Sequence, residues 1–186
     1  LSDWSSVVCS SDLGTQTYTG AVTLSSGTRT LTTTDSNISF GSTLDSDAAL
    51  TPRALTLSMG TGTVQFNGVV GGTYALGAIS ITGNLDLNAA ILNGASSAGA
   101  ASISVSGTSD LGANVTTSGN QTYTGAVTLS TSNTLTTTSN GTISFGSTVD
   151  GSAAGKTLTI NTNGTGNTTF TGAVGSTTPL GNTTIN

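Results

Sequence analysis

The chain has 186 residues, of which Thr, Ser, Gly and Asn account for 107. Its three basic residues and eight Asp give a formal net charge of −5, which argues against nucleic acid as a partner because phosphates could not be neutralised. His and Glu are absent, which excludes imidazole catalysis and a Ser-His-Asp triad. No apolar run is long enough to span a membrane.

The first 13 residues differ in composition from the rest of the chain. They hold the single Trp and the single Cys, Trp4 and Cys9, and contain no Gly or Thr. Residues 3–13 closely resemble one translated reading frame of a common sequencing-library adapter, with Val7 as the departure. We therefore predict that residues 1–13 are an unstructured adapter artefact, the alternative being an ordinary linker or cap. Cys9 is assigned no redox, metal or nucleophilic role.

From Gln16 onwards the sequence is repetitive. The decapeptide Gln-Thr-Tyr-Thr-Gly-Ala-Val-Thr-Leu-Ser occurs at residues 16–25 and again at residues 121–130, an offset of 105 residues. A long exact repeat indicates an array of similar units. We divide the chain into a first unit, residues 14–118, and a second, truncated unit, residues 119–186. We expect both to belong to an internal fragment of a much larger protein.

A shorter period lies inside each unit. Aromatic residues recur at steps of 22 to 26 residues, at positions Tyr18, Phe40 and Phe66 and then Tyr123, Phe145 and Phe170. Between them, apolar pairs such as Val22/Leu24 and Leu55/Leu57 are separated by one residue, which is the period of a β-strand. Gly and Asn between the pairs supply the conformations that tight turns need.

This pattern predicts an all-β fold: a right-handed parallel β-helix, or solenoid, of about seven coils. Stacked coils lie about 4.8 Å apart, so one 105-residue unit would span four to five coils. Tyr18 and Tyr123 should then be equivalent rings stacked in the core. The alternative is a series of tandem β-sandwich repeats, which a 105-residue unit would fit but which does not require the shorter period.

Three blocks, residues 17–24, 143–151 and 170–175, resemble the repeat regions of very large bacterial surface proteins. These proteins are filamentous-haemagglutinin-like or autotransporter-type adhesins. The resemblance covers essentially all of residues 14–186. It implies an exported β-helical shaft on a Gram-negative cell, located extracellularly or on the outer-membrane surface.

Few residues are candidates for chemistry. Asp45 and Asp47 could share a strand face as a calcium site or a glycosidase pair, but we favour a solvated loop, because the equivalent stretch at residues 149–152 keeps only the first Asp. Asp45 and Asp150 recur before turns, which favours Asx-type turns. The three cations, Arg29, Arg53 and Lys156, form no visible cluster. We therefore predict no catalytic, cofactor-binding or metal-binding residues.

The favoured function is a structural spacer in an adhesin, without catalysis or cofactors. Its expected partners are neighbouring repeats of the parent chain and host or environmental glycans or proteins, with no nucleic acid and no membrane span. A Thr-rich face that binds ice or glycan is the alternative, and a glycan-active enzyme a weaker third hypothesis. Ice binding would need Thr-x-Thr in nearly every coil, and the sequence shows this irregularly. The exposed strands at the two ends of the solenoid predict end-to-end association.

Overall fold

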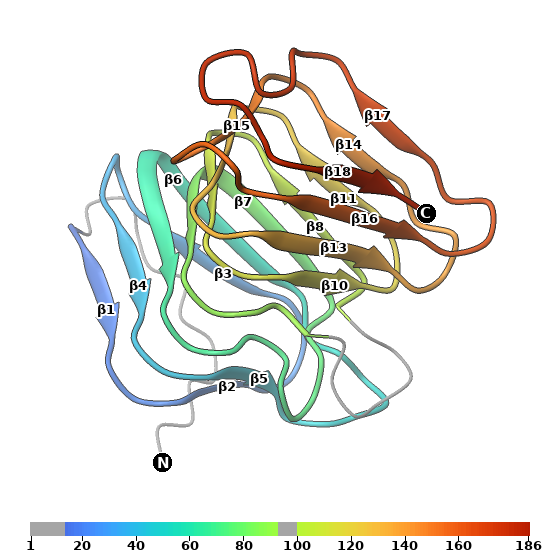
Figure 1. Cartoon of the computed structure of the whole chain (residues 1–186). Helices are drawn as coiled ribbons and strands as arrows, with labels where there is room; N and C mark the ends of the chain where they lie inside the picture. The colour runs from blue at the N-terminus through green and yellow to red at the C-terminus, as the bar shows by residue number, and fades with distance from the viewer. Residues whose placement is uncertain (1–13, 93–99) are drawn as a thin grey trace.

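A computed structural model describes residues 14–92 and 100–186 of the chain. The prediction for residues 1–13 lies outside these described residues. Within them the protein is all-β: 18 strands, each paired in parallel, wind into a right-handed β-solenoid of about seven turns (Figure 1). The predicted fold class is confirmed, and the β-sandwich alternative is not what the chain forms.

The strands stack into three faces, which the chain visits in the order face 1, face 2, face 3 in each coil. Face 1 consists of β1 (Gln16–Tyr18), β4 (Ile38–Phe40), the second halves of β6 (Leu55–Phe66) and β7 (Ala78–Leu87), β9 (Ser109–Leu111), β12 (Val127–Leu129) and β15 (Val149–Gly151). A single bridge at Val174 adds one more position to this face.

Face 2 consists of β2 (Val22–Leu24), β5 (Leu44–Ser46), bridges at Val70 and Ile91, β10 (Val115–Thr117), β13 (Asn133–Thr137), β16 (Leu158–Thr162) and β18 (Thr183–Ile185). Face 3 consists of β3 (Arg29–Thr32), the first halves of β6 and β7, β8 (Ser102–Val105), β11 (Gln121–Tyr123), β14 (Ile143–Phe145) and β17 (Thr168–Phe170). The faces run the length of the described chain.

The strands β6 and β7 each turn the corner from face 3 to face 1 without ending. In β6 the bend lies at Gly60, whose φ of 59° is in the left-handed region that favours glycine. In β7 it lies at Gly83, with a φ of 140°. The pairing of β6 with β7 shifts register between Ser58 and Thr63, as expected for an irregularity at a bend.

Every face presents alternate side chains to one continuous apolar interior. On face 2, for example, Leu44, Val70, Ile91, Val115 and Leu135 stack one above another and are fully buried. The i, i+2 spacing seen in the sequence is therefore the spacing of inward-facing residues. Because each coil contacts only its neighbours, the core is a set of columns rather than one globular cluster.

Aromatic rings form two such columns. Tyr18, Phe40 and Phe66 stack on face 1, with ring centroids 5.1 and 5.5 Å apart. Tyr123, Phe145 and Phe170 stack on face 3, with centroids 5.5 and 4.8 Å apart. The prediction of core-stacked tyrosines is confirmed, but the prediction that Tyr18 and Tyr123 are equivalent is wrong, because the two rings lie on different faces.

The reason is that the 105-residue repeat is not a whole number of turns. Going from β1 to β11 takes four complete turns and two further faces, within the predicted four to five coils. Each segment of the second unit therefore lies one face away from its counterpart in the first. The same strand sequence can build either face, because both require alternating inward and outward residues.

The two sequence units are joined without a structural break. The unit boundary between residues 118 and 119 is crossed by the pairing of β8 with β11 and of β10 with β13. These pairs have the same parallel register as those inside each unit. The described chain is therefore one continuous solenoid and not two separately folded domains.

Candidate functional site

The acidic residues that the sequence singled out are not brought together as a pair. Asp45 lies outward on β5, and Asp47 follows the end of that strand. The Asp47 carboxylate accepts hydrogen bonds from Arg53 Nε at 2.6 Å and Nη2 at 3.1 Å. The Arg53 guanidinium lowers the pKa of Asp47 below its usual value. This exposed ion pair closes a surface loop and contributes little stability.

Asp45 and Asp150 have the same role in the two units. Asp45 Oδ1 accepts hydrogen bonds from the backbone N–H groups of Thr73 (2.8 Å) and Tyr74 (3.3 Å). Asp150 Oδ1 accepts them from Thr177 (2.8 Å) and Thr178 (3.2 Å). The prediction of local Asx turns is therefore wrong. Each carboxylate accepts hydrogen bonds from the backbone of the following coil and not from its own turn.

These bonds belong to a wider set in which an Asp or Asn at one corner accepts from the backbone N–H of a Thr one coil later. The other pairs are Asp35 with Thr61, Asn37 with Thr63, Asn84 with Thr108, Asn114 with Thr134, Asn120 with Thr142 and Asn140 with Thr165. The bond from Thr61 N–H lowers the pKa of Asp35. Each pair satisfies a backbone donor at a corner, where no strand partner does so.

The cations likewise form no common site. Arg29 Nη2 donates to Ser25 O and to Ser26 Oγ, the latter at 3.0 Å. Arg53 is engaged by Asp47, which is the only ion pair in residues 14–92 and 100–186. These contacts of Arg29 and Arg53 are local, each to residues within seven positions along the chain.

A polar network that sequence reasoning missed accompanies each of the two core-stacked tyrosines, Tyr18 and Tyr123. Tyr123 Oη donates to Gln121 Oε1 at 3.2 Å, and Gln121 Nε2 donates to Thr117 Oγ1 and to Thr136 O. Burial raises the pKa of Tyr123. In the first unit Tyr18 Oη donates to Gln16 Oε1 at 3.0 Å in the same way. The network satisfies the polar tip of a ring that lies in an apolar core.

In residues 14–92 and 100–186, three other side chains have buried polar atoms without a hydrogen-bond partner. They are Ser109, at its Oγ, Asn133, at both Oδ1 and Nδ2, and the partly buried Thr168, at its Oγ1. Asn133 aligns with the fully buried Leu158 of the next coil. An unpaired buried amide destabilises the coil that contains it, so Asn133 weakens this part of the core.

Face 3 carries a continuous outward array of hydroxyl side chains. One row, in register through all seven strand positions, consists of Thr30, Thr56, Ser80, Ser104, Thr122, Ser144 and Thr169. A second row, two residues further along each coil, consists of Thr32, Ser58, Thr82, Ser106, Thr124, Gly146 and Thr171. When Ser is counted, the Thr-x-Thr pattern that looked irregular in the sequence recurs in every coil on this face except at Ser144, where the second position is Gly146.

Face 1 differs from face 3 in its outward chemistry. Its outward residues are Thr17, Ser39, Gln65, Asp86, Asp110, Thr128 and Asp150. Asp86 and Asp110 lie directly opposite each other, where like charges destabilise a sheet. Gln65 Nε2 donates to Asp86 at 2.9 Å, and Ser130 Oγ donates to Asp110, which offsets part of the repulsion.

Across residues 14–92 and 100–186, no group of three or more His, Cys, Asp or Glu side chains could hold a metal ion. In the same residues no helix is long and apolar enough to cross a membrane. Comparisons with protein-family models, with curated proteins and with solved structures found no match. The geometry that remains is a stacked core with one face, face 3, on which an outward row of hydroxyl side chains is in register through all seven strand positions.

Proposed function

We propose that this chain is a structural repeat segment, a shaft or spacer, of a large secreted or cell-surface adhesin. It holds a binding region at a distance from the cell and performs no catalysis. The observation that carries this proposal is the continuity of the buried interior along all three faces of the described chain. Because each coil contacts only its neighbours, adding units adds length without requiring a new core.

The internal repeat gives a direct test of this additive behaviour. Inserting a second copy of residues 16–120 after Asn120 should lengthen the solenoid by four and two-thirds coils, about 22 Å at a strand spacing of ~4.8 Å. The inserted strands would start on face 3, the face that β11 already occupies with the same sequence. Small-angle X-ray scattering of the original and extended chains measures the change in maximum dimension.

The matched control is an insertion of the same composition with its sequence order scrambled. It should add an unfolded segment, seen as a larger radius of gyration without added β signal in circular dichroism. An extended chain whose units fold as separate compact bodies, or whose length does not increase, would contradict the spacer proposal.

The hydroxyl array of face 3 favours a second candidate function, binding of ice through a Thr-rich face. The two rows bear no charge and repeat at the spacing of adjacent strands in one direction and of alternate residues in the other. A regular, uncharged lattice of hydroxyl and methyl groups can order water on its surface. Glycan binding on the same face is the less specific form of this candidate.

Thermal hysteresis of the purified chain tests the second candidate. Thr122→Glu places a charge in the middle of the array on face 3 and should abolish the hysteresis. Thr128→Glu, the outward Thr of face 1 in the same decapeptide, should leave it unchanged. Absence of hysteresis in the unmodified chain at millimolar concentration would reject ice binding and leave the spacer proposal intact.

A further inference from the structure

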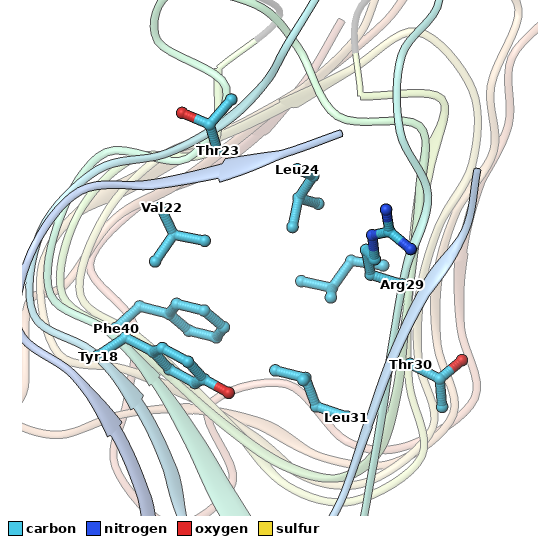
Figure 2. Close-up of a pocket in the computed structure, with 9 residues that line it drawn as sticks. Tyr18, Val22, Thr23, Leu24, Arg29, Thr30, Leu31 and Phe40 are labelled. Atoms are coloured by element: carbon cyan, nitrogen blue, oxygen red, sulfur yellow. The ribbon is translucent and has the colours of Figure 1, made fainter. Parts of the chain in front are cut away.

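Most inward positions of the solenoid carry apolar side chains. Figure 2 shows the pattern in the first coil, where Val22 and Leu31 point into the interior and Thr23 and Thr30 point away from it. In residues 14–92 and 100–186, seven Ser, Thr, Asn or Gln side chains depart from this pattern because they are buried: Thr33, Ser46, Ser109, Thr117, Gln121, Asn133 and Thr137. Five of the seven lie within residues 109–137, so the interior is not uniform along its length.

The coils formed by residues 55–92 and 100–105 have an apolar interior, and we call them the apolar section. No Ser, Thr, Asn, Gln or charged side chain is buried among these described residues. Their two long strands, β6 and β7, contain 12 and 10 residues and pair at eight register positions (Figure 1). The apolar section therefore combines uninterrupted hydrophobic burial with the longest strand pairing in the described chain.

Residues 109–137, which we call the polar section, are built from shorter strands. The strands β9, β10, β11 and β12 have three residues each, and β13 has five. Their pairings with neighbouring strands extend over only three to five register positions. The polar section therefore has less pairing along each strand than the apolar section, in addition to its polar inward residues.

Two of the buried polar side chains in the polar section oppose burial directly. Ser109 lies between Leu85 and Val127 of the neighbouring coils, and its Oγ has no hydrogen-bond partner among the described residues. Asn133 aligns with Leu158, and neither its Oδ1 nor its Nδ2 has such a partner. Each of these groups loses its hydration on folding without gaining a hydrogen bond, so each favours the open form of its coil.

The other three buried polar side chains link the two coils of the polar section. Gln121 Nε2 donates to Thr117 Oγ1 at 3.2 Å within its own coil and to Thr136 O at 2.9 Å in the next coil. Thr137 Oγ1 donates to Gly141 O at 2.9 Å. Because the amide of Gln121 bonds across the boundary between the coils, opening either coil alone would break its network. The two coils should therefore open together.

We propose that the polar section is a weak layer built into the solenoid. It opens as one unit, in an unfolding event smaller than global unfolding, while the apolar section stays folded. When fully extended, residues 109–137 would span about 95 Å at ~3.3 Å per residue. The role of this opening rests on the proposed spacer function, in which the weak layer is where the shaft lengthens first under load.

Hydrogen exchange of the full chain, followed by mass spectrometry of peptic peptides in sub-denaturing urea, tests the weak layer. Backbone amides of β9 to β13 should exchange at least about tenfold faster than those of β6, which pairs with no strand of the polar section. The exchange rates of β9 to β13 should share one dependence on urea concentration, because these strands open together. Equal protection of β6 and of β9 to β13 would overturn the proposal and leave the spacer function intact.

Three substitutions test whether the unpaired polar side chains create the weak layer. Asn133→Leu introduces the residue type of its aligned neighbour Leu158, and Ser109→Val introduces that of Val127. Each should slow exchange throughout β9 to β13 at least about fivefold and leave the exchange of β6 unchanged. Ser109→Ala removes the unpaired hydroxyl without adding volume and should act in the same direction, so the test does not depend on space for a larger side chain.

Thr134→Val is the matched control, since Thr134 follows Asn133 on β13 and faces outward. Its backbone N–H, which donates to Asn114 Oδ1 at 2.8 Å, is kept in the variant. Exchange rates of β9 to β13 should therefore stay within about twofold of those of the unmodified chain. Exchange that none of the three inward substitutions slows would overturn the proposal. So would equal slowing by Thr134→Val, because the effect would then come from strand propensity and not from buried polar groups.

Discussion

Replacing Phe145 with alanine should lower the free energy of unfolding by about 3–5 kcal/mol. Phe145 is 1% exposed and lies between the rings of Tyr123 and Phe170 in the column of face 3. The strands that carry these two rings, β11 and β17, are hydrogen-bonded to β14 on either side. They cannot move inward to fill the space, so a cavity would remain. Urea unfolding followed by far-UV circular dichroism measures the loss.

Two variants serve as controls for this prediction. Ser144→Ala changes the outward neighbour on the same strand and should shift stability by less than about 0.5 kcal/mol. Phe170→Ala removes the partly buried ring at the end of the column and should cost less than Phe145→Ala. Equal losses at Phe145 and Phe170 would contradict a core whose stability depends on contacts from both sides.

Gly125→Ala should destabilise the protein by about 1–3 kcal/mol, the usual cost of inserting a methyl group into filled space. The new Cβ would lie 2.3 Å from Gly107 O and 2.5 Å from Gly107 C, which are backbone atoms. Gly107 is itself held by the hydrogen bond from its N–H to Gly83 O at 2.9 Å. The corner would therefore have to separate from the coil beside it.

The sequence supplies a close control, since Gly20 and Gly125 are preceded by the same four residues and followed by the same five residues of the repeated decapeptide. Gly20→Ala should leave the unfolding midpoint unchanged or raise it slightly, because alanine reduces the entropy of the unfolded chain. Thermal unfolding of both variants in dilute solution measures the difference. Similar losses of stability in Gly20→Ala and Gly125→Ala would contradict this prediction. They would show that the substitution acts through the backbone conformation of the glycine and not through its close contact with another coil.

The sequence predicted the solenoid because its two periods have direct physical meanings. Spacing of apolar residues at i, i+2 fixes which side chains point inward, as Val22 and Leu24 do. The recurrence of aromatic residues at 22 to 26 residues fixes the length of one coil, as the stacking of Phe40 on Phe66 shows. Both signals are local, so they could be recognised without knowing how the coils are oriented.

The assignment of strands to faces could not be predicted in this way. All three faces have the same alternation, so nothing in Gln-Thr-Tyr distinguishes face 1 at β1 from face 3 at β11. The face on which a repeated strand lies depends on the sum of small differences in corner length over four turns. A Thr-rich face was considered from the sequence, but its alignment on face 3 could not be predicted, because its members become neighbours only when the faces are known.

The roles of corner residues were only partly predictable. Gly was expected to supply positive φ, and Gly60 does so. Gly125 is needed instead for its close approach to another coil, which no local signal reveals. Asp45 and Asp150 were expected to bond their own turns, yet they bond backbone N–H groups 27 to 29 residues later. A sequence pattern shows that a hydrogen-bond acceptor is present, but not which coil supplies the backbone N–H groups that it bonds.

The fractional turn of the repeat has a consequence for any array built from such units. One unit advances the chain by four turns and two faces, so three consecutive units complete fourteen whole turns. A loop at a fixed place in the repeat would then point in three directions in succession before returning to the first. A shaft of this kind would have no preferred side, and whatever it displayed would be distributed radially around its axis.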